Sequence, residues 1–189
     1  SRQEWVFIDN RFMLNGFIGK QENQLQFSAG LGIRTDNFSS TYHVSTSKDK
    51  QLHNYVIASL KKEALLSGKW FYEAHLLSYV TGNTAGSSAI NALLGKDMGK
   101  WGSLSVGASQ NINAAPYNYT TYYNQYDTIL TSFNKESVSQ LNGQWAIDRW
   151  NLSIGARDYI ISNYIYLNSL QLPSQYANTF NIAQVWLRK

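Results

Sequence analysis

Residues 24–34, read as QLQFSAGLGIR, alternate apolar and polar side chains over their whole length. The apolar face of such a strand carries Leu25, Phe27, Ala29, Leu31 and Ile33. The other face is small or polar and ends on Arg34. A period of two over about 11 residues is long enough for a tilted strand to cross a bilayer. Glycines on the polar face predict a crowded or curved inner wall.

The same alternation recurs along the chain, with short turns between successive pairs of strands. Clear strands are predicted at 70–80, 103–110 and 150–157, and weaker ones at 11–20, 54–64, 87–95, 137–147 and 179–187. Short turns are predicted near 21–23, 67–69, 96–102 and 148–149, and longer segments rich in Tyr and Asn lie between them. This pattern predicts an all-β fold, an antiparallel up-and-down meander of about 8–9 strands that is part of a transmembrane β-barrel.

Residues 56–67 leave an alternative open, because they contain several good helix formers. The strands on either side and the short turn that follows favour a strand there. A membrane-spanning helix is excluded, since the sequence has no run of 18 apolar residues.

The sequence has few charged residues, but its mean hydropathy is not high. Charged residues make up 15% of the chain, against about 25% in ordinary soluble domains. The mean hydropathy is −0.35, and the missing charge is replaced by Asn, Gln, Ser, Thr, Tyr and Gly. Such a balance fits a wall with one lipid face and one wet face, and it also fits a polar soluble β-protein.

The length of 189 residues permits one domain, and we expect a single β-barrel domain over 1–189 without a linker. The chain has no initiating Met and no signal peptide, and both its ends read as strand. We therefore expect an internal or C-terminal-half fragment of a longer protein. The net charge of +4 is scattered, which predicts no nucleic-acid partner. The absence of Cys excludes disulfides.

Aromatic residues gather at the predicted strand ends. Four tryptophans lie close to the short turns and form a candidate aromatic girdle: Trp70, Trp101, Trp145 and Trp150. Tyrosines crowd the longer segments at the opposite ends. Two such belts are expected where rings sit at the two lipid–water boundaries. The alternative is that aromatic residues simply favour strand ends and hairpins.

Four charged or titratable residues fall on the polar faces of the clear strands. These candidate pore-lining residues are Arg34, Glu73, His75 and Arg157. Charged side chains in a channel set its ion preference through their field. On the lipid face an Arg near the midplane would cost about 2–4 kcal/mol, so the polar face is where a barrel requires them. A soluble β-sandwich would show the same alternation.

The sequence contains no recognisable catalytic or metal-binding motif. The histidines His43, His53 and His75 lack ligand spacing, and Glu73 with His75 is better explained as a polar pair on a wet wall. The segment 95–100 does not match a phosphate loop, and no nucleophile elbow occurs. We therefore expect no enzyme activity, no cofactor and no metal.

Two segments resemble hairpins of the putative porin family of Bacteroidota. One is 100–110, KWGSLSVGASQ, and the other is 152–167, LSIGARDYIISNYIYL, which continues through 170–176, LQLPSQY, into 180–184, FNIAQ. The resemblance covers about residues 70–189. It implies a β-barrel in the bacterial outer membrane, with the lipid bilayer and small polar solutes as partners. It also implies a passive diffusion channel without catalytic residues.

Two functions thus follow from the sequence. The first is a segment of an outer-membrane, porin-like barrel that passes small solutes. The alternative is a soluble or surface-exposed all-β carbohydrate-binding module, to which the aromatic segment 117–126 points. They differ in whether the apolar face is exposed to lipid or packed against a second sheet.

Overall fold

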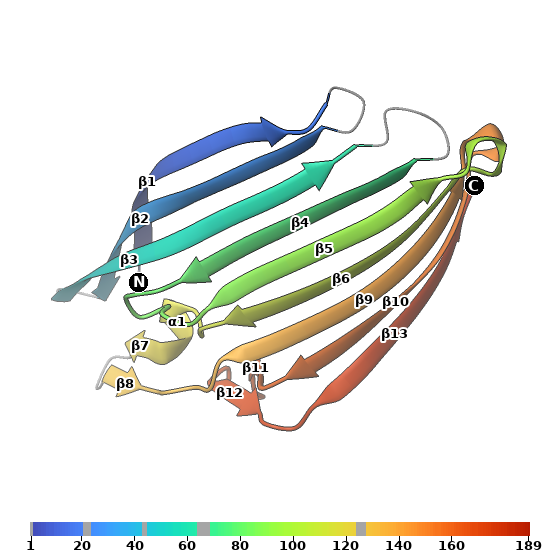
Figure 1. Cartoon of the computed structure of the whole chain (residues 1–189). Helices are drawn as coiled ribbons and strands as arrows, with labels where there is room; N and C mark the ends of the chain where they lie inside the picture. Colours follow the sequence, from blue (N-terminus) through green and yellow to red (C-terminus); the bar gives the residue numbers. More distant parts are fainter. Residues whose placement is uncertain (1, 21–23, 43–44, 64–68, 124–127) are drawn as a thin grey trace.

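The chain forms one large curved sheet in the computed structural model, which describes residues 2–20, 24–42, 45–63, 69–123 and 128–189 (Figure 1). Nine strands pair in the order β1-β2-β3-β4-β5-β6-β9-β10-β13, each antiparallel to its neighbours. Their bounds are β1 Arg2–Ile18, β2 Leu25–Tyr42, β3 Ser45–Lys62, β4 Trp70–Tyr79, β5 Ser88–Asp97, β6 Ser103–Asn113, β9 Glu136–Ile147, β10 Leu152–Ser162 and β13 Phe180–Arg188.

The predicted all-β meander is confirmed, and each of the nine predicted strands overlaps an observed one. The helix considered for 56–67 is wrong for its described part, because β3 continues through Lys62. The first three strands are 17 or 18 residues long, so most of the segment expected as a long loop between β2 and β3 is instead extended hairpin. The order starts with β1 and ends with β13, which makes the described sheet open.

Two of the predicted short turns are seen in full. The 3-10 turns η2, Gly99–Trp101, and η3, Asp148–Trp150, join β5 to β6 and β9 to β10. The sequence predicted a strand that begins at residue 150. Trp150 instead lies in the turn η3, and β10 begins at Leu152. The turn at 21–23 and most of the turn at 67–69 lie outside the described residues. The ends of the strands near these turns are called the turn end here, and the opposite ends the loop end.

Small additional elements at the loop end were not predicted. They are α1 Tyr117–Thr120, β7 Thr121–Tyr123, β8 Thr128–Leu130, β11 Tyr164–Leu167 and β12 Pro173–Tyr176. The segment 152–167 is not one strand, because β10 stops at Ser162 and Asn163 has a φ of 58°. No described helix is long and apolar enough to cross a membrane.

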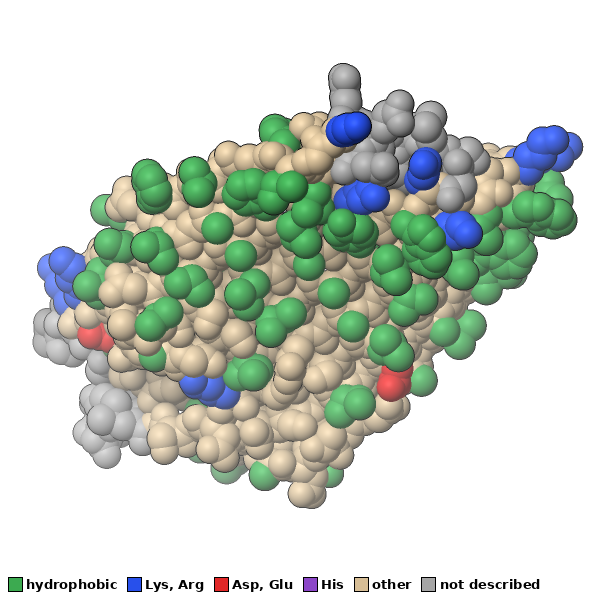
Figure 2. All heavy atoms as spheres, viewed as in Figure 1, with side chains coloured by type: hydrophobic (Ala, Val, Ile, Leu, Met, Phe, Trp, Pro, Cys, Tyr) green, Lys and Arg blue, Asp and Glu red, His purple; other side chains and the backbone are tan. Residues whose placement is uncertain are grey.

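The pairing register places the predicted apolar and polar stripes on opposite faces. Directly paired residues of antiparallel strands share a face, so each row of partners can be followed across the sheet. One face, called the apolar face, carries the larger apolar side chains of β2, β4, β6 and β10 together: Leu25, Phe27, Leu31, Ile33, Tyr72, Leu76, Leu104, Val106, Leu152 and Ile154. Figure 2 shows hydrophobic side chains spread over one face of the molecule, with few charged ones among them.

The other face, called the polar face, is crowded by aromatic rings that lie over glycines. A Cβ added at Gly32 would overlap the ring of Tyr55, and one at Gly95 would overlap Phe71. Gly155 lies in the same way under Trp186. Each glycine and its aromatic partner sit on adjacent strands, where the missing side chain lets the ring lie flat on the backbone. The expectation that these glycines mark a crowded face is therefore confirmed.

Candidate channel-lining site

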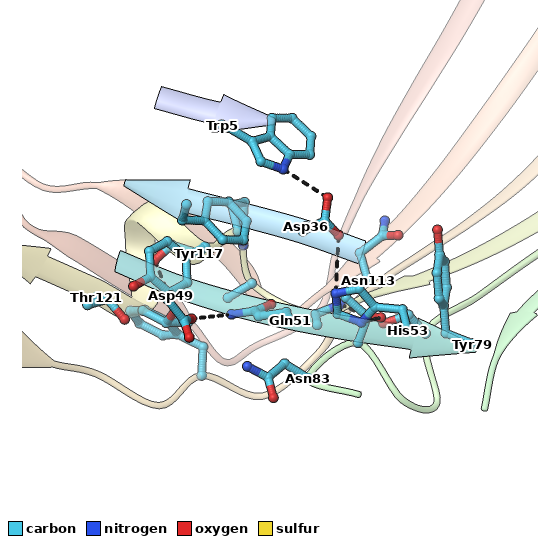
Figure 3. A pocket seen from close by; sticks show the side chains of 18 of the residues that line it. Trp5, Asp36, Asp49, Gln51, His53, Tyr79, Asn83, Asn113, Tyr117 and Thr121 are labelled. Carbon is cyan, nitrogen blue, oxygen red and sulfur yellow. Dashed lines mark hydrogen bonds and ion pairs between the residues drawn. The ribbon is translucent and has the colours of Figure 1, made fainter. Parts of the chain in front are cut away.

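A cavity of about 1110 Å³ opens on the polar face at the loop end of β1–β3. The connection from β6 to β9 reaches across the face to this cavity, although β6 lies four strands from β2. Tyr117 of α1 stacks on Phe38 of β2, with ring centroids 4.2 Å apart (Figure 3). The cavity therefore lies on the polar face, between the sheet and this connection.

The register assembles the wall of the cavity from three successive rows across β1, β2 and β3. Residues two apart on one strand share a face, so each row adds one side chain per strand to the same surface. From the loop end inward, the rows are Trp5–Phe38–Asp49, Phe7–Asp36–Gln51 and Asp9–Arg34–His53.

Asp36 joins three side chains of this wall and is only 5% exposed. The indole Nε1 of Trp5 donates to Asp36 Oδ1 at 2.9 Å, and Arg34 donates to the same oxygen through Nε and Nη2 at 3.0 Å. The Nε2 atom of His53 lies 3.2 Å from Asp36 Oδ2. A buried carboxylate is stable only when such partners replace its lost hydration, so these bonds fix the conformation of the wall.

His53 extends the network toward the connection between β4 and β5. Its side chain is 1% exposed, and its Nδ1 atom lies 2.8 Å from Thr84 Oγ1. The His53 and Tyr79 rings form a T-shaped contact, with 6.1 Å between their centroids. Gly82 turns with a φ of 87° beside the Leu52 carbonyl, where a Cβ would clash. The backbone of this connection is therefore held against β3.

A second polar cluster lies one row further from the loop end. Arg11 Nη2 and the Tyr55 hydroxyl both bond Asp9, each at 2.6 Å. Tyr55 is 3% exposed and lies 5.3 Å from the ring of Tyr79. The two clusters together bind β1, β2 and β3 to one another through their polar-face side chains.

The four candidate pore-lining residues all lie on the polar face but do not form one site. Arg34 belongs to the cavity wall described above. Glu73 and His75 bond each other on β4, with 2.6 Å between Oε1 and Nε2. Arg157 on β10 donates from Nη1 to the Tyr159 hydroxyl at 3.0 Å and lies 5.4 Å from the ring of Trp186. That these residues line a pore stays a prediction.

The four girdle tryptophans lie together at the turn end. Trp70 and Trp145 belong to one row of partners that passes through Lys96 and Leu104 on the apolar face. Trp145 donates from Nε1 to the Trp101 carbonyl at 2.8 Å. All four are at least 38% exposed. Their placement fits a belt of rings, and its contact with lipid stays a prediction.

Sequence reasoning missed Asp36, His53 and Trp5 as parts of one site. The predicted strand stopped at Arg34, because Thr, Asp, Asn and Ser occupy both faces beyond it and no local signal marked this site. The cluster holds a single carboxylate with one imidazole, and no group of three or more candidate metal ligands occurs among the described residues. The arrangement surrounds the cavity with polar side chains that can position a solute.

The family model described as "Putative porin" matches residues 2–189. No curated protein and no solved structure matches the chain.

Proposed function

Because the chain belongs to the putative porin family, we propose that its sheet forms part of the wall of a β-barrel in the bacterial outer membrane. Small polar solutes diffuse passively along its polar face, and the lipid bilayer contacts its apolar face. Residues 1–189 act in this proposal as one wall domain without a catalytic role. A single observation on the apolar face supports it beyond the family.

The apolar side chains form a band that crosses the rows of paired residues obliquely. On β9 the last apolar position toward the loop end is Leu141, followed by Ser139 and Ser137. Its row runs through Ala108, Ala92, Ala74 and Leu60 to Phe27. On β2 the apolar series continues for three more outward positions and ends at Ile33. The edge of the band has therefore moved six residues along the strand.

This displacement corresponds to the strand tilt of a membrane barrel. Six residues rise about 20 Å, while the five strand spacings from β9 to β2 amount to about 24 Å. The band thus makes an angle of about 40° with the rows, within the roughly 35–45° by which barrel strands tilt in a membrane. A band level with a bilayer must cross the rows at the tilt angle, whereas a sandwich core has no such requirement.

The alternative of a soluble carbohydrate-binding module requires the apolar face to be packed. Leu31 is 62% exposed, Leu141 58% and Val106 51%. Apart from the large sheet, the described strands form only two two-stranded sheets, β7-β8 and β11-β12. An exposed apolar surface of this extent fits contact with lipid better than contact with water.

Planar-bilayer recording of the purified full-length protein tests this function. We expect stepwise ion conductance and a folded species that resists sodium dodecyl sulfate until it is heated. Heat-denatured protein is the control and should give no steps. A protein that stays soluble without detergent and gives no conductance would contradict the proposal.

A further inference from the structure

The loop-end cavity carries a continuous aromatic surface. Trp5 and Phe38 stack with an interplanar angle of 4° and a centroid distance of 5.9 Å. Tyr117 continues the stack from the connection on the other side of Phe38, at an interplanar angle of 20°. Trp5 is 56% exposed, so a large part of the stack remains open to a solute. An exposed aromatic surface of this kind offers an apolar platform on which the C–H face of a sugar ring can pack.

Planar polar side chains line the cavity beside this stack. Asp49, Gln51, Asn83 and Asn113 also line the cavity (Figure 3). Gln51 Nε2 donates to Asp49 Oδ2 at 2.9 Å, and the carboxylate and the amides keep further capacity to accept and donate. Vicinal hydroxyl groups can bond to such planar groups in pairs. The aromatic stack and these side chains together match the two sides of a saccharide.

The charges around the cavity balance each other. Three acidic residues, Glu4, Asp36 and Asp49, and three basic residues, Arg34, Lys48 and Lys135, line it. Asp36 and Arg34 form an ion pair at 3.0 Å, and the Lys135 ammonium donates to the Ala85 carbonyl. The formal charges of these six residues cancel, so the cavity has no excess of either sign that would favour an anion or a cation. An uncharged, hydroxyl-rich solute fits it best.

We propose that this cavity is a binding vestibule for neutral oligosaccharides, which rest on the aromatic stack before they pass along the channel. Its volume of about 1110 Å³ slightly exceeds the roughly 300–1,000 Å³ of small-ligand pockets, so more than one sugar ring can enter. The proposal rests on the proposed channel function and adds a substrate class to it. Binding must be weak and reversible, because a channel site has to release its solute.

Two measurements with maltohexaose test the vestibule. In planar bilayers we expect the sugar to reduce the ion current through the open channel in a concentration-dependent way. In detergent micelles we expect saturable binding by calorimetry, which needs no conductance. The acidic trisaccharide trigalacturonate should bind more weakly than maltohexaose. If the channel conducts but maltohexaose neither binds nor blocks, the vestibule proposal is wrong. If maltohexaose binds but no current flows, the channel function is wrong and the vestibule stands.

Substitutions locate the binding to the stack. Trp5→Ala and Tyr117→Leu should each weaken maltohexaose binding by between about threefold and tenfold, the value of one aromatic contact. The matched control is Trp150→Ala, because Trp150 is 58% exposed but lies in the turn η3 at the opposite end of the strands. Heat-modifiable migration on gels shows that each variant folds. Equal weakening by all three variants, or by none, would overturn the assignment.

Discussion

At the residue scale, Asp36 determines how the wall of the cavity is held together. It is the shared acceptor for Trp5 and Arg34, and it lies beside His53. These side chains come from β1, β2 and β3, so one carboxylate connects three strands. Its loss would leave the Arg34 guanidinium partly buried without its anion, and the buried His53 imidazole without this polar partner.

Asp36→Asn should therefore destabilise the fold by roughly 3–5 kcal/mol, the usual effect of removing one partner of a buried ion pair. Urea unfolding in detergent micelles, followed by tryptophan fluorescence, measures the change. The control is Asp49→Asn, because Asp49 is half-buried and accepts a hydrogen bond from the neutral Gln51. The two variants should differ clearly, and equal stability would show that the Asp36 network is dispensable.

Arg157 illustrates a residue whose charge and packing act together. Its Nε atom is buried without a hydrogen-bond partner, while its guanidinium faces Tyr159 and Trp186. The neighbouring Asp158 carboxylate accepts a hydrogen bond from Asn181 at 2.6 Å.

Arg157→Glu should shift the reversal potential of the channel toward cation preference, because a negative charge replaces a positive one on the polar face. The measurement is the reversal potential in a salt gradient. Arg149→Glu, in the exposed turn η3, makes the same charge change away from the wall. Unchanged selectivity together with lost heat resistance would mean that Arg157 acts only as a packing partner.

At the element scale, the aromatic–glycine pairs let a ring of one strand lie over the backbone of the next on the polar face. Gly155→Ala would push a methyl group into Trp186, and overpacking of this kind costs about 1–3 kcal/mol. Gly143→Ala is the matched control, since nothing lies within 4 Å of its added Cβ. We expect Gly155→Ala to lower the temperature of heat modification while Gly143→Ala leaves it unchanged. The reverse order would refute the role given to these glycines.

The contrast between apolar and polar side chains along each strand explains which elements the sequence could predict. Strands such as β2, β4, β6 and β10 were visible because apolar and polar side chains contrast strongly at period two. The loop-end half of β2, residues 35–42, lost that contrast, since Thr, Asp, Asn and Ser occupy both faces. Its extended conformation, and with it the Asp36 site, depends on pairing with β1 and β3. The contact of Tyr117 with Phe38 joins segments far apart in sequence and leaves no local signal.

At the scale of the whole molecule, the proposed barrel wall requires the apolar face to contact lipid. The oblique band argues for it, because its angle of about 40° agrees with the tilt of membrane-barrel strands. The chain has no cysteine, so single cysteines can be introduced and spin-labelled without a background reaction.

The most direct test is the accessibility of such labels to oxygen and to a water-soluble nickel complex in liposomes. Labels at Leu31, Val106 and Ile154 on the apolar face should favour oxygen, because oxygen concentrates in the hydrocarbon. Labels at Ser28, Ser105 and Ser153 on the polar face should favour the nickel complex. Ile33 should behave as lipid-exposed and Ser139 as water-exposed, as the oblique edge of the band requires. Preference for the nickel complex at all of these positions would contradict the barrel-wall account.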